Sequence, residues 1–168
     1  MSKETPVDYH ELLDRNLGDL SSISYVELLN TTQWFDKRQE IFLRDNFTCQ
    51  MCDKLIDNSK HRFLGWTSIR VDSLGETCWI PLQVHHAYYI LHTVPWDYPN
   101  DALVTICATC HQDYHNKNKV PVYNEDGVAV EVETCKRCNG SGWFFEYRHV
   151  QDGLCFECHG ERFSRRLK

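Results

Sequence analysis

The polar and apolar positions of the chain first follow a helical rhythm. Residues 8–17, "DYHELLDRNL", and residues 30–46 space their apolar side chains three and four positions apart. This spacing predicts two amphipathic helices. The oxygens of Asn30, Thr31 and Thr32 are well placed to cap the second helix. We therefore expect a helical start to the chain.

Two short apolar runs then change the rhythm. Residues 78–84 and 103–107 have the length and composition of strands. Proline cannot donate to a strand ladder, so Pro81 indicates an edge position for the first run. Residues 108–116 follow the second run directly and predict a helix. The order of strand, loop, strand and helix predicts an α+β fold.

The chain divides into three segments. Residues 1–48 form the helical lead-in, and residues 49–116 form a small core that begins and ends near cysteine pairs. Residues 117–168 contain a linker hairpin, with a tight turn at Asp126-Gly127, and a C-terminal module. We predict these as three structural units.

Composition favours a globular protein. Of the 168 residues, 42% are hydrophobic and 12% aromatic, which argues against disorder. No apolar run approaches the roughly 20 residues that a membrane-spanning helix needs. The polar N-terminal stretch lacks the apolar centre of a secretory signal. We expect a cytoplasmic, soluble protein without a membrane partner.

Eight of the nine cysteines form four CxxC pairs. A reducing compartment disfavours disulfides, and paired CxxC motifs suit tetrahedral zinc. Two pairs make one site, which predicts two structural Zn²⁺ ions. Disulfides or CxxC redox chemistry are the alternatives. The first site would use Cys49, Cys52, Cys107 and Cys110, and the second Cys135, Cys138, Cys155 and Cys158.

The histidines near the first cysteine site suggest a catalytic centre. A zinc ion shared by the first two CxxC pairs would bring the strand of His85 and His86 close to His111. A divalent cation held by His85 and His111 would keep positions open for water and substrate oxygens. His86, with an ordinary pKa of about 6.5, would be free to act as a general base. His115 follows His111 at helical spacing and is interpreted as a structural partner.

Three stretches resemble a known family. "KRQEIFLRDNFTCQMC", "LQVHHAYY" and "LVTICATCHQDYH" are similar to the HNH endonucleases, the ββα-metal nucleases, over residues 25–115. The resemblance implies that His86 activates water and that His85 and His111 bind one catalytic Mg²⁺, Mn²⁺ or Ni²⁺ ion. It also implies hydrolysis of DNA to 5′-phosphate and 3′-hydroxyl ends.

One position departs from the family pattern. The middle Asn or Asp of the motif falls at Ala102 in this chain. A shift of one or two residues in the loop would let Asp101 or Asn100 take its place. We predict Asp101 as the candidate catalytic residue here. Trp34 and Arg38 match an upstream helix of the family and are interpreted mainly as packing residues.

The C-terminal repeat resembles a second kind of zinc module. CxxCxGxG followed by CxxCxG is similar to the zinc modules of DnaJ chaperones, with cysteines for one zinc ion. The module is interpreted either as a docking surface for nucleic acid or protein, or as a self-contained unit whose aromatic residues form its own core. Its basic residues include Lys136, Arg137, Arg148, Arg162, Arg165 and Arg166, and its aromatic residues Trp143, Phe144, Phe145 and Tyr147.

Together these features predict a metal-dependent endonuclease that acts on DNA. The net charge of −6, which zinc–thiolate sites would make more negative, means that attraction to DNA must be local. One alternative is a catalytically inactive zinc-binding adaptor for nucleic acid or protein. Another is a DnaJ-like thiol or client-binding factor.

Overall fold

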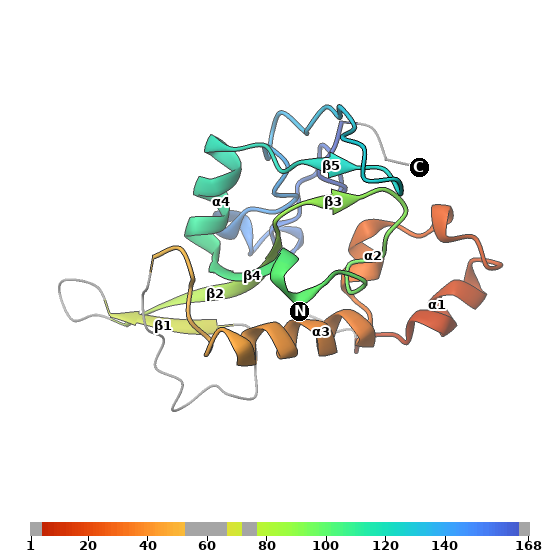
Figure 1. Ribbon diagram of the computed structural model, residues 1–168. Coiled ribbons are helices and arrows are strands. Elements are labelled where there is room, and N and C mark those ends of the chain that lie inside the picture. The colour runs from red at the N-terminus through yellow and green to blue at the C-terminus, as the bar shows by residue number, and fades with distance from the viewer. Residues whose placement is uncertain (1–4, 53–66, 72–76, 165–168) are drawn as a thin grey trace.

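The computed structural model describes residues 5–52, 67–71 and 77–164, with only the backbone described at 67–71 and 77–80. The fold is mixed α+β, as the sequence predicts (Figure 1). The helices are α1 (Tyr9–Arg15), α2 (Tyr25–Leu29), α3 (Thr32–Arg44) and α4 (Ala108–Lys117). The strands are β1 (Thr67–Val71), β2 (Thr77–His86), β3 (Tyr89–Ile90), β4 (Leu103–Cys107) and β5 (Val122–Tyr123). Short 3₁₀ turns are η1 (Leu20–Ser22), η2 (Asn100–Ala102), η3 (Phe145–Tyr147) and η4 (Gln151–Gly153).

Strand β2 is the centre of an antiparallel sheet of order β1-β2-β4. Its first half pairs with β1 up to the contact of Pro81 with Thr67, and its second half pairs with β4 from Leu82 onward. The edge position that Pro81 indicated is therefore wrong. Because Pro81 lies where one partner strand replaces the other, its missing N–H is tolerated inside a central strand.

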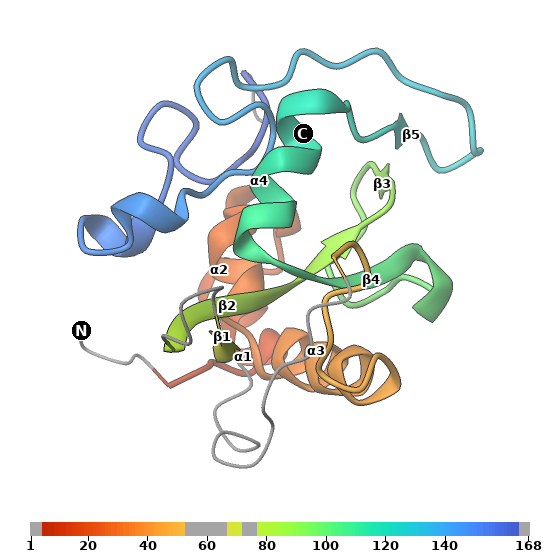
Figure 2. The same cartoon turned by 90° about the vertical axis from the view of Figure 1, so that its left-hand side faces the viewer.

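Helices α3 and α4 lie on opposite sides of β2 and β4 (Figure 2). Trp34, Ile41 and Phe42 of α3 are buried in a cluster with Leu82 and Val84 of β2. Successive side chains of a strand point to opposite faces, so the even-numbered residues of this stretch of β2 face α3. The odd-numbered residues are left to face α4.

The N-terminal helices begin at caps that the sequence supplies. The side chain of Thr31 accepts a hydrogen bond from the backbone N–H of Trp34, within the predicted capping stretch. Ser24 and Glu27 form a reciprocal capping box at α2. The spacing of apolar residues does not predict this helix of five residues. A helix this short shows little more than one turn of apolar spacing, and its cap is the clearer signal.

The linker after α4 contains the expected turn and one unexpected strand pair. Asn124 and Val128 are joined by a backbone hydrogen bond, and Gly127 has a φ of +75°. This confirms the tight turn at Asp126-Gly127. Strand β5 also pairs in parallel with β3, which brings the linker back against the chain just after β2. A two-residue strand has no periodicity to detect, so this pairing was not predicted.

The C-terminal module packs tightly against the rest of the protein, beside α4 (Figure 2). A Cβ atom at Gly160 would lie 2.4 Å from the Cγ2 atom of Val26 in α2. Glu161 accepts a hydrogen bond of 3.1 Å from the backbone N–H of Tyr25. Only glycine at position 160 allows this approach, so the module is not an independent appendage.

Arg165 and Arg166 of the C-terminal module lie outside the described residues. The side chain of Cys78, the one cysteine that is not part of a CxxC pair, lies outside them as well. Within the described part of the chain, no helix has the length and apolar character needed to cross a membrane.

Candidate metal centre

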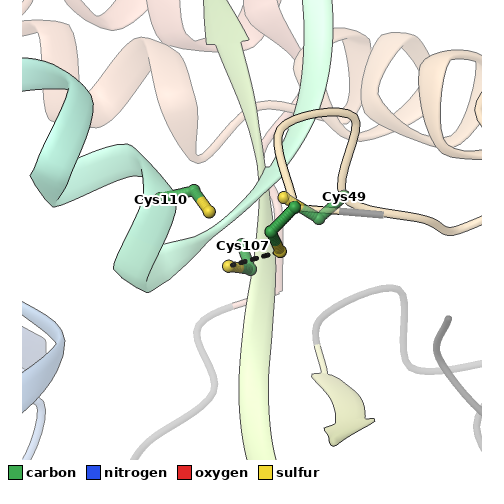
Figure 3. A group of neighbouring side chains, drawn as sticks. Cys49, Cys107 and Cys110 are labelled. Carbon is green, nitrogen blue, oxygen red and sulfur yellow. Dashed lines mark hydrogen bonds between the residues drawn. The ribbon is translucent and has the colours of Figure 1, made fainter. Parts of the chain in front are cut away.

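The first four-cysteine cluster joins α3 to the β4–α4 junction. Cys49 lies in the loop after α3, Cys107 ends β4, and Cys110 lies in the first turn of α4 (Figure 3). Cys52 follows Cys49 in the same loop. The four sulfurs lie within 4.8 Å of one another, and those of Cys52 and Cys107 are 4.0 Å apart. Tetrahedral zinc with bonds of about 2.3 Å would separate its sulfurs by about 3.8 Å, whereas a disulfide bond is about 2 Å long. The cluster fits zinc.

The second four-cysteine cluster is formed entirely by the C-terminal module. The sulfurs of Cys135 and Cys155 are 3.9 Å apart, and those of Cys138 and Cys158 are 3.7 Å apart. All four residues are buried, and the backbone N–H of Gly142 donates to the Cys138 sulfur at 3.3 Å. The chain thus contains two clusters suited to two structural zinc ions.

In each cluster one cysteine is favoured as the thiolate, whereas burial and hydrogen bonding to neighbouring sulfurs raise the pKa of Cys107, Cys110, Cys138 and Cys155. A hydrogen bond from Cys107 is the main cause that lowers the pKa of Cys49 to about 4, against the opposing effect of burial. A hydrogen bond from Cys138 likewise lowers the pKa of Cys158 to about 5. Since zinc binds the thiolate form, each cluster offers at least one ligand that is ready at neutral pH.

Three histidines form a separate cluster between β2 and α4. His85 comes from β2, while His111 and His115 lie one turn apart on α4, and one ring nitrogen of each lies within 4.8 Å of the others. The Nε2 atoms of His111 and His115 are 3.1 Å apart. Both ring nitrogens of His85 are buried without a hydrogen-bond partner among the described residues. Buried polar atoms are rarely left unpaired, so the site favours a bound ion or water.

The three imidazoles are held in their neutral form. Burial is the main cause that lowers the pKa of His85 to about 3 and that of His115 to about 4, and it lowers the pKa of His111 as well. Neutral imidazole nitrogens bind divalent transition metals, whereas protonated ones cannot. The group therefore fits a divalent cation with three nitrogen ligands.

The C-terminal module orients one of these ligands. The backbone carbonyl of Asn139 accepts a hydrogen bond from His115, whose Nδ1 lies 3.5 Å from the position of a Cβ atom at Gly140. The Nδ1–H group thus points to the backbone just after Cys138, and the lone pair of Nε2 is directed toward His111. Hydrogen bonds of this kind fix the tautomer of metal-binding histidines.

His86 occupies the opposite face of β2. Its ring stacks on Trp34 of α3, with centroids 5.2 Å apart, and it is only 3% exposed. Its Nε2 atom lies 2.9 Å from the carbonyl oxygen of Pro95. Because a carbonyl only accepts, Nε2 carries the proton and Nδ1 keeps the lone pair. Burial lowers the pKa of His86 to about 3, so the ring is neutral at physiological pH.

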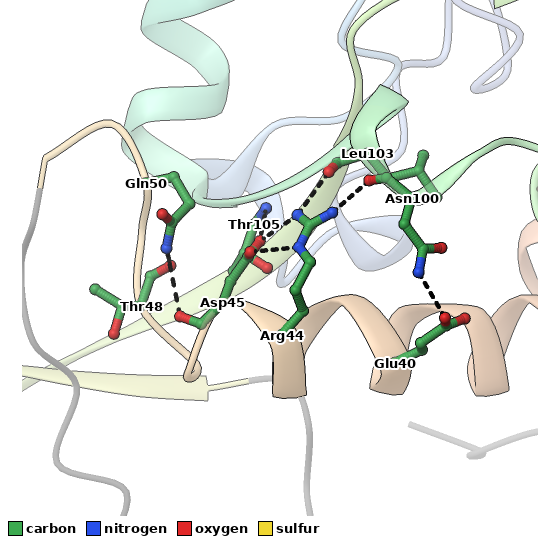
Figure 4. Close-up of polar contacts among 8 residues, drawn as sticks. All are labelled: Glu40, Arg44, Asp45, Thr48, Gln50, Asn100, Leu103 and Thr105. Carbon is green, nitrogen blue, oxygen red and sulfur yellow. Dashed lines mark hydrogen bonds and ion pairs between the residues drawn. The ribbon is translucent and has the colours of Figure 1, made fainter.

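The two candidates for the missing motif residue lie away from the histidine cluster. The side-chain amide of Asn100 donates to Glu40 of α3 (Figure 4). Its side-chain oxygen accepts from Lys37, which also lies on α3. Asp101 is exposed in η2. Asp101 does not belong to the groups whose ligand atoms converge. The structure therefore uses Asn100 to attach the loop before β4 to helix α3.

The sequence did not indicate the positions that two residues near the site take in the structure, His115 and Arg162. His115 was interpreted as a structural partner, although its spacing of four from His111 is the signal that places both on one helix face. Arg162 was noted only as one basic residue of the C-terminal module, but its guanidinium is buried against Tyr25 and Tyr89. No local pattern predicts that contact, because the contacting residues are separated by more than 70 positions.

Comparison of the chain with protein-family models, with curated proteins and with solved structures finds no match to any of them. The fold and the clusters of cysteine and histidine side chains therefore define the class of protein. The chain is a small α+β protein with two four-cysteine clusters suited to zinc and a histidine triad suited to a further metal ion.

Proposed function

We propose that the protein is a metal-dependent endonuclease of the HNH type, acting on the phosphodiester bonds of DNA. One observation carries the proposal. Both nitrogens of His85 are buried and unpaired among the described residues, and one of them lies within 4.8 Å of a ring nitrogen of His111 and of His115. The supporting elements β2, β4 and α4 follow one another in the strand–strand–helix order of the HNH resemblance.

The roles of the side chains follow from their chemistry. His85, His111 and His115 would hold a divalent cation, which supplies Lewis-acid stabilisation of phosphate charge when bound. The carbonyl of Asn139 holds His115 in the tautomer that leaves Nε2 available. His86 takes the general-base position of the resemblance, with its lone pair on Nδ1. The ring lies on the face of β2 opposite the other three histidines and is covered by Trp34, so it would have to leave that packing to take a proton from water at the cation.

A catalytically inactive adaptor is the second candidate. It is favoured by the deep burial of His86 behind Trp34 and by the use of Asn100 in structural contacts. In this alternative the metal-binding clusters build a surface that binds nucleic acid or another protein. It predicts partner binding that survives replacement of His86.

The test is cleavage of supercoiled plasmid DNA with Mg²⁺, Mn²⁺ or Ni²⁺. We expect nicked or linear product from the wild type and at least a hundredfold less from His111→Ala and His86→Ala. His149→Ala, which replaces an exposed histidine of the C-terminal module, is the matched control and should retain activity. Zinc content and circular dichroism verify that each variant is folded. Equal cleavage by the wild type and both site variants would rule the proposal out.

A further inference from the structure

Arg162 extends from the C-terminal zinc module into the interior of the protein. Its Cζ atom lies 3.4 Å from the ring centroid of Tyr25 and 3.9 Å from that of Tyr89. Tyr25 begins α2 and Tyr89 begins β3, two elements that lie far apart in the chain. The guanidinium is therefore fixed between two aromatic rings that come from opposite ends of the core.

The hydrogen-bonding capacity of Arg162 is not satisfied by the protein. Its Nε and Nη1 atoms are buried and have no hydrogen-bond partner among the described residues. No ion pair with a carboxylate is found for it in that part of the chain. Tyr89 accepts a side-chain hydrogen bond from the guanidinium and both rings compensate part of its charge through cation–π contacts, but Nε and Nη1 are left without an acceptor. A permanent cation with unused donors needs an anion.

The charge of Arg162 acts on the histidine cluster. After burial, which is the larger cause, the positive charge of Arg162 contributes to the low pKa of His85, His111 and His115. It acts on His86 from the other side of β2 as well. The ring of Tyr89 contacts both Arg162 and His86, with a centroid separation of 5.3 Å from the latter. Arg162 is therefore linked through Tyr89 to the histidines of β2, and the residue as a whole is half-buried.

We propose that Arg162 is the anion-binding residue of the histidine centre and takes a phosphate group of the phosphodiester substrate. This inference rests on the proposed function. Arginine suits the task because it stays charged and donates to phosphate oxygens in a planar geometry. It also places one permanent positive charge near the histidines in a chain whose net charge is −6. The C-terminal zinc module then completes the site by supplying Arg162.

The test measures binding of inorganic phosphate and of dimethyl phosphate to the zinc-loaded full chain, with and without Mn²⁺, by ³¹P NMR titration. We expect Arg162→Gln to weaken binding of both probes at least tenfold, and Arg162→Lys to fall between it and the wild type. Arg137→Gln is the matched control, because Arg137 also covers an aromatic ring of the module, Phe156 at 3.9 Å, but is exposed. It should bind both probes as the wild type does.

The outcomes separate this inference from the proposed function. Wild-type protein that binds neither probe, or Arg162→Gln that binds within twofold of the wild type, overturns the inference. If Arg162→Gln loses its two zinc ions, the Arg162→Lys variant is used in its place. Arg162→Lys that binds both phosphate probes and cleaves plasmid as the wild type does counts against a specific role for the guanidinium. Phosphate binding that depends on Arg162 without plasmid cleavage supports the inference and rejects the nuclease. Plasmid cleavage that is the same in the wild type and in Arg162→Gln supports the nuclease and rejects the inference.

Discussion

At the scale of single residues, the adjacent histidines of β2 have separate tasks. His85 points to α4, where His111 and His115 meet it, and His86 points to α3, where Trp34 covers it. The alternation of a strand dictates this division. One imidazole is left with unpaired nitrogens, as a metal ligand would be, and the other has the packing of a core residue with one hydrogen bond to Pro95.

The burial of His86 makes stability depend on pH. Its pKa is lowered to about 3 in the folded chain, against about 6.5 in an unfolded chain. Above pH 6.5 both states are neutral and the stability is fully present. As the pH falls below 6.5, only the unfolded chain takes up the proton, and folding loses about 1.4 kcal/mol per pH unit through this residue, down to about pH 3.

His86→Phe isolates this effect because it keeps an aromatic ring against Trp34. We expect the free energy of unfolding of the wild type, measured with urea in excess zinc, to fall relative to the variant by about 2 kcal/mol between pH 7 and pH 5. Release of zinc in acid affects both proteins and cancels in the difference. A difference that stays constant across this pH range would show that His86 protonates freely in the folded protein.

At the scale of elements, the sequence predicted the parts with strong periodicity or fixed spacing. Helices α3 and α4 and strands β2 and β4 follow the predicted runs, and the CxxC spacing placed eight cysteines in two clusters. The contact of Arg162 with Tyr25 and Tyr89 depends on how distant segments pack, and no local pattern encodes it. The sequence pointed to His85 as a metal ligand and to His86 as a free base, but no local pattern indicated that His86 would be buried behind Trp34.

The attachment of the C-terminal module to α2 can be tested at Gly160. Gly160→Ala would bring a Cβ atom to 2.4 Å from Val26 and 2.7 Å from Leu154, at a φ of +81°. We expect it to lower the free energy of unfolding by about 2 to 4 kcal/mol, from overpacking and backbone strain together. Denaturation with urea, followed by tryptophan fluorescence, measures the change.

Gly127→Ala is the matched control for this substitution. Its φ of +75° is similar, but a Cβ atom there would have no neighbour within 4 Å. We therefore expect a loss of only about 1 kcal/mol, from backbone strain alone. Val26→Ala should recover part of the stability of Gly160→Ala. Equal losses for the two glycine variants would contradict tight packing between the module and α2.

At the scale of the whole molecule, the two four-cysteine clusters position the histidine triad, which belongs to neither of them. The first cluster fixes the start of α4 against the loop after α3 and so sets the position of His111. The second brings the carbonyl of Asn139 to His115 and Arg162 to the neighbourhood of the triad. A small core alone would not hold three buried imidazoles together, and metal clusters commonly supply this stability in small proteins.

Metal content combined with an anomalous-scattering map of crystals grown with Mn²⁺ tests this account most directly. We predict two zinc ions per chain in the cysteine clusters and a manganese peak among His85, His111 and His115. His85→Ala should lose the manganese peak and keep both zinc ions. Two zinc peaks with no anomalous density at the triad, in crystals where the three rings are ordered, would contradict the assignment of a metal centre there.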